Sequence, residues 1–203
     1  MLKLYCAPKT ISTAVVVAVN EGVHWEPIRV DIAGGEQSHD PFLSLNPKGR
    51  VPVLVTPEGP LTETGAILEY LGETALPDLV PADPLHRARM REVMFYLAST
   101  MHVNHAHLRR GHRWADSEAA RADMAAKVPE TMAASAAYIE ALIEGPYLFG
   151  PDPTLADPYL YAAASWLDGD GVAIENFPKL ATFKAMMESR ASVRKAIADG
   201  FFG

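Results

Sequence analysis

The stretch Asn46–Leu54 (NPKGRVPVL) places a proline at the entrance to an apolar strand. Proline has no N–H to give to a sheet, so Pro52 is unusual at that position. If the Val51–Pro52 peptide bond is cis, the chain turns sharply and leaves the backbone N–H and C=O of Val51 free. Those two groups are what an extended peptide needs in order to pair as an additional strand.

A second stretch, Thr62–Leu68 (TETGAIL), marks the beginning of a helix a few residues downstream. Glu63 and Thr64 open this helix, and the N–H groups of a first helical turn can hold a carboxylate. A simpler interpretation is that Thr62 or Thr64 only caps the helix. Together, the two stretches would bind a peptide backbone and an amino-acid head group, and they predict a site for a small acidic tripeptide.

The composition is that of an ordinary globular chain with one large or two small domains: 203 residues, 49% hydrophobic and 21% charged. A formal charge of −7 argues against nucleic acid or an anionic membrane as the main partner. Cys6 is the only cysteine, so no intrachain disulfide requires an oxidising compartment. The sequence shows neither a secretory signal nor an apolar run that approaches a membrane span, and a cytoplasmic protein is therefore expected.

The first part of the chain alternates strand and helix patterns in the order βαβ–ββα. The expected strands are residues 2–5, 25–30, 53–55 and 61–62, and the expected helices are residues 11–21 and 64–73. The run Ala14–Val19 is apolar on nearly every face, so periodicity alone does not decide between helix and strand there. Its length, its polar start and the Gly22 that follows favour a helix. Residues 31–45 suit a surface loop with a short helical turn.

The second part of the chain has helical patterning throughout. The expected helices are residues 85–111, 117–143, 155–167 and 178–197. Pro129 is expected to end or kink the second of these, because it removes a helical donor and clashes with the preceding turn. Leu76–Pro84 breaks both periodicities and is interpreted as a linker. The predicted organisation is an α/β domain over residues 1–75, a linker over 76–84 and an all-α domain over 85–203.

On these motifs the chain resembles the cytosolic glutathione S-transferases. The run from Leu4 to Leu71 is similar to their glutathione-binding half, which has a thioredoxin-like fold, and the two stretches quoted above resemble that family's cis-proline segment and helix start. The segment Gly150–Asp157 (GPDPTLAD) is similar to the family's Thr/Ser-x-x-Asp segment before a buried helix. There Thr154 and Asp157 are expected to bond each other's backbone and not a substrate. The resemblance is closest to bacterial beta-, theta- and phi-like members.

The resemblance implies that the protein binds glutathione and stabilises its thiolate. Lowering a thiol pKa of about 8.5 by two units requires a preference for the thiolate of roughly 2.7 kcal/mol. The candidate hydroxyls are Thr10, Ser12 and Tyr5 near the first strand–helix junction, and Thr10 aligns with the catalytic hydroxyl of serine-type members. Alternatively, Thr10 only caps the helix and Ser12 bonds the backbone. The catalytic cysteine of the beta class falls on Ile11, so Cys6 does not match it, and a glutaredoxin-like oxidoreductase is poorly supported.

The resemblance also assigns the groups that hold the ends of the peptide. Glu63 and Thr64 look like the pair that binds the γ-glutamyl amine and carboxylate. Lys48 matches a family ligand position for the glycyl carboxylate, and Arg50 is a second cation in reach, although most cations in loops are only solvated. Val51 and Pro52 correspond to the family's peptide-binding segment.

Histidines cluster in the first long helix of the second part. At about 100° per residue, His102, His105 and His112 fall within an arc of roughly 80°, and His107 lies on another face. No acidic or cysteine ligand accompanies them at close spacing, so a metal site is not expected. His102 resembles a histidine of the beta class that faces the electrophile pocket.

The expected function is therefore conjugation of glutathione to a small electrophile, with detoxification as its setting and with no metal or organic cofactor beyond the co-substrate. Halogenated or α,β-unsaturated carbon compounds are the targets that the resemblance implies. Glutathione-dependent isomerase, dehalogenase or peroxidase chemistry would use the same site. A non-catalytic ligand carrier or stress adaptor on this fold is the alternative from another class. Members of the family are usually homodimers, and the same is expected here.

Overall fold

A computed structural model describes residues 1–202, and the chain divides into two compact units. The first unit comprises Met1–Pro84 and the segment from Glu188 onward, and the second comprises Leu85–Met187. The sequence-based boundaries assign the segment from Glu188 to the helical domain. In the structure, its helix α9 (Ala191–Ala198) packs against α1 (Ser12–Val19) of the first unit.

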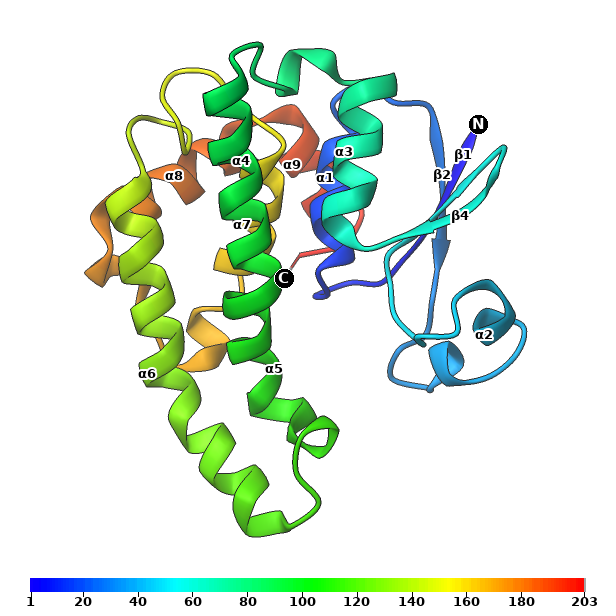
Figure 1. Cartoon of the computed structure of the whole chain (residues 1–203), viewed down its shortest axis with the longest axis vertical. Coiled ribbons are helices and arrows are strands. Elements are labelled where there is room, and N and C mark those ends of the chain that lie inside the picture. Colours follow the sequence, from blue (N-terminus) through cyan, green and yellow to red (C-terminus); the bar gives the residue numbers. More distant parts are fainter. Residues whose placement is uncertain (203) are drawn as a thin grey trace. The chain divides into compact units, whose positions relative to one another are not determined.

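The first unit is built on a four-stranded mixed sheet in the order β2–β1–β3–β4 (Figure 1). Its strands are β1 (Leu2–Cys6), β2 (Trp25–Arg29), β3 (Val53–Thr56) and β4 (Gly59–Thr62). The pair β1–β2 is parallel, whereas β1–β3 and β3–β4 are antiparallel. With α1 between β1 and β2 and α3 (Thr64–Thr74) after β4, the predicted βαβ–ββα order is confirmed.

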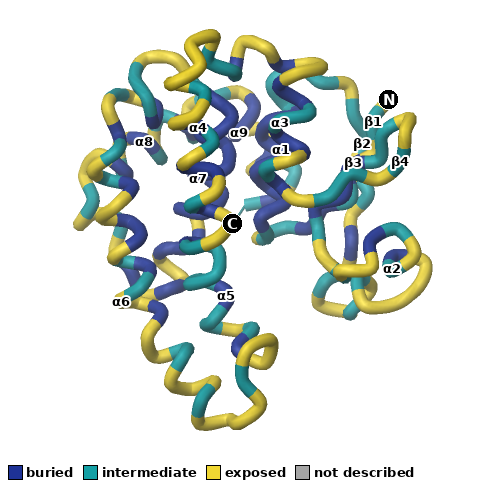
Figure 2. Tube along the Cα trace, viewed as in Figure 1, coloured by how far each residue is buried: buried dark blue, intermediate teal, exposed yellow. Residues whose placement is uncertain are grey.

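Helix α1 is buried along its whole length (Figure 2). It contacts β1, α3 and α9, so no face of it meets solvent. A helix that is covered on all sides must be apolar all round, which is why its sequence shows no helical periodicity. The expectation of a helix is correct. The loop that follows β2 also contains the expected short helix, α2 (Phe42–Leu45).

The second unit is all-helical. Its helices are α4 (Pro84–Tyr96), α5 (His102–Arg110), α6 (Glu118–Leu142), α7 (Ala156–Ala164) and α8 (Pro178–Ser189). The single helix expected over residues 85–111 is interrupted by a π-helical turn, Leu97–Met101. The helix expected over residues 178–197 is two helices, because Arg190 adopts an extended conformation between α8 and α9.

Helix α6 continues through Pro129, so of the two expected effects, an end or a kink, the end of the helix is excluded. A side chain of α5 forms hydrogen bonds with the part of α6 that directly follows Pro129. The Asn104 side chain of α5 donates to the Thr131 carbonyl (3.3 Å) and to the Ser135 hydroxyl (3.1 Å), and α5 packs along α6. These tertiary contacts offset the roughly 3 kcal/mol that a proline costs inside a helix.

The segment before α7 forms part of the predicted capping arrangement. The buried Asp157 carboxylate accepts hydrogen bonds from the Thr154 N–H and hydroxyl, and it also accepts one from the Leu148 N–H (2.9 Å). The Thr154 hydroxyl in turn accepts from the Ala156 N–H (3.3 Å). One half of the expected reciprocal arrangement is therefore present: Asp157 bonds the Thr154 N–H, but the Thr154 hydroxyl bonds the Ala156 N–H and not that of Asp157, and the helix that follows is buried. No helix within residues 1–202 combines the length and the apolar character that crossing a membrane requires.

Candidate functional site

Three features of the first unit converge on one edge of its sheet. Strand β1 ends beside the point where β3 begins, because Tyr5 pairs with Val53, and β4 ends at the same level, because Val53 pairs with Thr62. The edge therefore carries the loop between β1 and α1, the segment that precedes β3, and the start of α3. These are the three segments in which the sequence analysis placed its site residues.

The segment before β3 contains the expected cis peptide bond, Val51–Pro52. Val51 lies outside the sheet, and within residues 1–202 no hydrogen bond joins its backbone to another residue. Asn46 shapes the approach to it: its buried side chain donates to the Arg50 carbonyl (2.6 Å) and accepts from the Lys48 N–H (3.2 Å). The backbone of Val51 is therefore available for strand pairing.

The start of α3 is open to an anion. No side chain among residues 1–202 caps this helix, so the alternative in which Thr62 or Thr64 serves only as its cap is not seen. The Glu63 carbonyl accepts from the Ile67 N–H (3.0 Å), and Thr64 is buried. The N–H groups of the first turn have no acceptor among residues 1–202. They lie at the N-terminus of the helix, which is the positive end of the helix dipole.

Glu63 itself holds an unusual backbone conformation, with φ of +74°, a region that favours glycine. A non-glycine residue in such a conformation costs about 1–3 kcal/mol, and such residues concentrate at ligand-binding positions. Here the conformation lies between β4 and α3, at the position where the sequence predicts contact with an amino group.

The structure brings Lys48 and Glu63 together. Lys48 Nζ donates to the Thr62 hydroxyl (2.7 Å) and forms an ion pair with Glu63 Oε1. Both side chains are well exposed, at 43% and 69%, so the pair contributes only about 0–1 kcal/mol to stability. A ligand that carries one ammonium and one carboxylate can replace both halves of this pair without leaving a charge unpaired. The sequence did not predict the part that Thr62 plays here.

The two candidate hydroxyls are linked to each other. Ser12 Oγ is completely buried, accepts from the Ala7 N–H (3.0 Å) and lies 2.7 Å from Thr10 Oγ1. The Thr10 hydroxyl also donates to the Ala7 carbonyl (2.8 Å) and accepts from the Ser12 N–H (3.3 Å). Thr10 is only partly buried, so of the two it is the one that a ligand can reach. The helix-capping role considered for Thr10 is not seen, because the N-cap position of α1 is Ile11 and no side chain caps the helix within the described residues.

Tyr5 is partly buried, and Cys6 lies in the interior of the first unit. The Tyr5 ring packs edge-on against Phe42, with 6.0 Å between ring centroids. Cys6 is fully buried, and this desolvation raises its pKa to about 12, although the positive charge of Arg29 acts in the opposite direction. A thiol with such a pKa carries almost no thiolate at neutral pH. The oxidoreductase alternative, which needs a reactive cysteine, therefore has no support.

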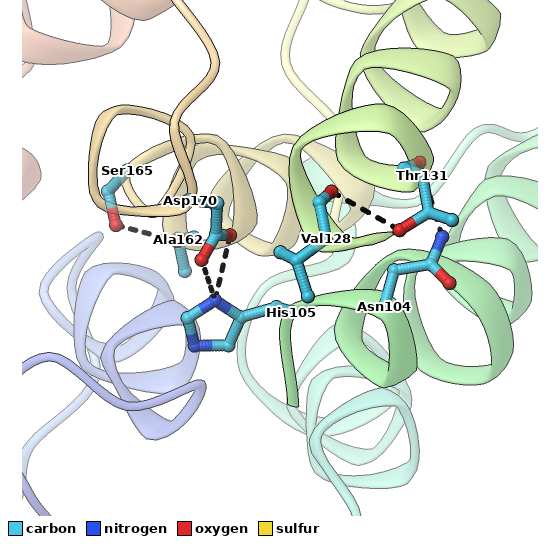
Figure 3. A network of polar contacts seen from close by, with 7 residues as sticks. All are labelled: Asn104, His105, Val128, Thr131, Ala162, Ser165 and Asp170. Atoms are coloured by element: carbon cyan, nitrogen blue, oxygen red, sulfur yellow. Dashed lines mark hydrogen bonds and ion pairs between the residues drawn. The ribbon is translucent and has the colours of Figure 1, made fainter. Parts of the chain in front are cut away.

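In the second unit, histidines surround Trp166 (Figure 3 shows the polar contacts of His105). The His105 ring stacks on Trp166 at 4.2 Å and 17°, and its Nδ1 lies 2.8 and 2.9 Å from the two oxygens of Asp170. The ring of His102 lies 5.1 Å from Trp166. Trp166 and Asp170 could not be predicted from the sequence, because they lie about 60 residues beyond the histidines and belong to no motif.

The remaining histidine contacts do not suggest a metal centre. His107 packs edge-on against Trp114, with 4.7 Å between ring centroids. Within the described residues, no group of three or more His, Cys, Asp or Glu side chains is placed to hold a metal ion.

Comparison with known proteins identifies the family. The profile of the glutathione S-transferase N-terminal domain matches residues 1–73, and that of the glutathione S-transferase C-terminal domain matches residues 105–199. The chain is 31% identical over 205 residues to a maleylacetoacetate isomerase of Pseudomonas aeruginosa, covering 96% of this chain and 95% of that protein. It is 28% identical to glutathione S-transferase GstA of Escherichia coli O157:H7, with 97% and 98% covered.

A solved structure is more similar still. A glutathione transferase homologue from Sulfitobacter, crystallised with bound glutathione, shares 49% identity and superimposes with a TM-score of 0.97 over 100% of this chain and 99% of that one. The chain therefore belongs to the cytosolic glutathione S-transferase superfamily, as its motifs had suggested, and it has that family's fold.

Proposed function

We propose that this protein binds glutathione at the sheet edge of its first unit and stabilises the thiolate for reaction with an electrophilic small molecule. The observation that supports this most is the convergence of three complementary groups on that edge: the unpaired backbone of Val51, the uncapped start of α3 and the Thr10 hydroxyl. The glutathione bound in the Sulfitobacter homologue adds support from a similar protein.

Each group has a partner in the tripeptide. The Val51 backbone pairs with the cysteinyl residue in strand fashion, beside the buried ring of Pro52. The γ-glutamyl carboxylate meets the N–H groups of Thr64 and its neighbours at the start of α3, and the γ-glutamyl amine meets Glu63. The glycyl carboxylate forms an ion pair with Lys48, which replaces the ion pair between Lys48 and Glu63. Binding thus exchanges an internal ion pair for two ion pairs with the ligand.

The hydroxyl network favours a division of labour between Thr10 and Ser12. Ser12 accepts the Ala7 N–H and can give its own proton to Thr10 Oγ1, 2.7 Å away. Thr10 donates its own proton to the Ala7 carbonyl (2.8 Å), and in this proposal the hydroxyl turns that proton to the thiolate when glutathione binds. In this arrangement Thr10 donates directly, and Ser12 orients it from the interior. A hydrogen bond to a charged acceptor contributes about 1.5–3 kcal/mol, which is the range needed for a shift of one to two pKa units.

The reaction that follows binding is either conjugation or isomerisation. The name of the Pseudomonas aeruginosa relative favours glutathione-dependent isomerisation of an unsaturated acid as a second candidate. In that reaction the thiolate adds to the double bond and later leaves, so the first unit would act in the same way. The second unit supplies the electrophile pocket in this proposal, and His102 beside Trp166 is part of its lining.

We also propose a homodimer in the cytoplasm, on the strength of the family resemblance. Phe95 of α4 is 70% exposed and is a candidate contact residue for the second copy. Light scattering of the purified protein would test this: a mass of two chains supports the dimer, and a monomer at micromolar concentration refutes it.

Titration of the glutathione thiol in the presence of the protein, followed by thiolate ultraviolet absorbance, tests the main proposal. A midpoint about one to two units below that of free glutathione would support binding and activation together. Binding with an unshifted midpoint would favour the carrier alternative. Absence of binding would refute the assignment of Val51, Pro52, Glu63 and Thr64. Conjugation and isomerisation are then distinguished by product analysis with an activated aryl halide and with a cis-unsaturated dicarboxylic acid.

A further inference from the structure

The loop that carries Thr10 is attached to the far end of the chain. The N–H of Lys9 donates to the carbonyl of Phe201 at 3.0 Å, across 192 positions of sequence. Lys9, the residue directly before Thr10, has φ of +58°. This is a left-handed backbone conformation, which is unfavourable for residues other than glycine. Such a conformation persists only where surrounding contacts impose it. The Phe201 carbonyl is one such contact.

The end of α9 places that carbonyl. Gly200 adopts φ of +75° and ends the helix, and its N–H donates to the Ile197 carbonyl (2.9 Å). The N–H of Phe201 donates back to the Ala196 carbonyl (3.0 Å). These two bonds form the Schellman motif, in which a left-handed glycine turns the chain back over the helix end. The turn directs the Phe201 carbonyl to Lys9.

The Phe201 side chain anchors the turn. It is 1% exposed, and the guanidinium carbon of Arg29, at the end of β2, lies 4.7 Å from its ring centroid. Arg29 also donates to the Asp199 carbonyl. Arg29 of β2 therefore holds the turn in two ways, by a cation–π contact with the Phe201 ring and by a hydrogen bond to the Asp199 carbonyl. In Figure 1 the chain end, in red, accordingly reaches the loop at the start of α1.

The same segment is fixed at the opposite end of α1. Arg190 forms a two-pronged ion pair with Glu21 (3.0 and 2.7 Å), and the Asn20 side chain donates to the Ser192 carbonyl (3.2 Å). Because the segment is attached at both ends of α1, its last turn has a defined position relative to the Thr10 loop.

We infer that the C-terminal turn, residues 199–202, positions the Thr10 hydroxyl for thiol activation, with Phe201 and Arg29 as positioning residues. This inference rests on the proposed function. Val51, Glu63 and Lys48 belong to other loops, so loosening the turn acts on activation of the thiol and leaves recognition of the tripeptide unchanged.

Two variants test the inference in the full-length chain. Phe201→Ala removes the buried anchor, and Gly200→Ala strains the turn without a steric clash, because no atom lies within 4 Å of the added Cβ. Gly200→Ala also covers the case in which Phe201→Ala does not fold. Ile197→Ala is the matched control, since it shortens a 41% exposed apolar side chain on the same helix.

Three quantities are measured: hydrogen exchange of the Lys9 amide, the midpoint of the bound thiol, and glutathione affinity at a pH where the thiol stays protonated. In both variants we expect the Lys9 amide to exchange about tenfold faster and the thiol midpoint to rise by about half a unit to one unit. Affinity is expected to stay within about twofold of wild type, and the control is expected to match wild type in all three.

Each other outcome overturns a defined part of the inference. Unchanged Lys9 exchange in both variants would show that the turn does not hold the loop. Faster exchange with an unchanged midpoint would show that the turn holds the loop but has no part in activation. If wild type itself binds no glutathione, the proposed function fails and the positioning role with it. Exchange at Lys9 would then still report whether the turn holds the loop.

Discussion

Replacing Thr10 by valine is expected to remove thiol activation while glutathione still binds. Valine keeps the shape of threonine but has no hydroxyl. In the structure that hydroxyl lies 2.7 Å from Ser12 Oγ and 2.8 Å from the Ala7 carbonyl, and it is the member of the network that a ligand can reach. The substitution therefore deletes the group that would donate to the thiolate, and it leaves Val51 and the start of α3 untouched.

The size of the effect follows from the hydrogen bond that is lost. A bond to a charged sulfur contributes about 1.5–3 kcal/mol, so the midpoint of the bound thiol is expected to rise by about one to two units. Below both midpoints, turnover then falls about 10–100-fold, and KM for glutathione stays within about twofold. The bonds lost to Ser12 and Ala7 cost about 1 kcal/mol of stability, or roughly 2–4 °C in Tm.

The assay is the turnover of an activated aryl halide over a series of pH values, together with the absorbance titration of the bound thiol. Thr10→Ser is the matched control, because it keeps the hydroxyl and should behave like wild type. Ser12→Ala should raise the midpoint by a smaller amount, about half a unit, since it removes only the orienting partner. The reasoning is refuted if Thr10→Val binds glutathione and titrates like wild type. If Ser12→Ala alone abolishes activation, the two roles are reversed.

Three further results are expected. Glu63→Gln should weaken glutathione binding about tenfold, because the ligand ammonium loses its charged partner. Calorimetry of this variant and of Lys48→Gln tests the two ends of the tripeptide separately. Unchanged affinity in both variants would contradict the assignment of Glu63 and Lys48 as ligand contacts. Cys6 should resist alkylation at neutral pH in the native protein and react only on unfolding, since burial raises its pKa to about 12, and rapid native labelling would restore the redox alternative. Burial alone would raise the pKa of Glu21, but hydrogen bonds from Arg190 and Ser192 and the charge of Arg190 outweigh burial, so the net pKa is lowered. The ionised Glu21 therefore stabilises the fold above about pH 4.5, and this stabilisation is lost as the pH falls through the lowered pKa. The stability advantage of wild type over Glu21→Gln, measured by urea unfolding, should accordingly shrink on acidification, and a constant difference would count against it.

Features with local causes could be predicted from the sequence. Apart from α1, whose residues show no periodicity, the order of strands and helices follows from residue periodicity and turn residues. The cis bond at Pro52 was expected from the resemblance to the family's cis-proline segment, and the bond from Thr154 to the Asp157 carboxylate follows from their three-residue spacing. Each depends on residues within a few positions of one another, so the pattern of residue types carries the necessary information.

Features that depend on distant partners could not be predicted in this way. Helix α1 is apolar all round because three other elements cover it, and α6 passes through Pro129 because another helix holds it there. The ion pair between Lys48 and Glu63 and the contact of His105 with Asp170 join residues that only the fold brings together.

The three candidate hydroxyls illustrate the division most clearly. The sequence by itself determined that Thr10, Ser12 and Tyr5 all lie near the first strand–helix junction, because chain connectivity places them there. Only the tertiary structure shows how they differ in exposure: Ser12 is completely buried, whereas Thr10 and Tyr5 are each partly buried, with the Tyr5 ring packed against Phe42. It also decided that Phe201, at the other end of the chain, bonds to the residue before Thr10. Burial and long-range hydrogen bonds depend on contacts between residues far apart in the sequence, so local residue patterns do not predict them.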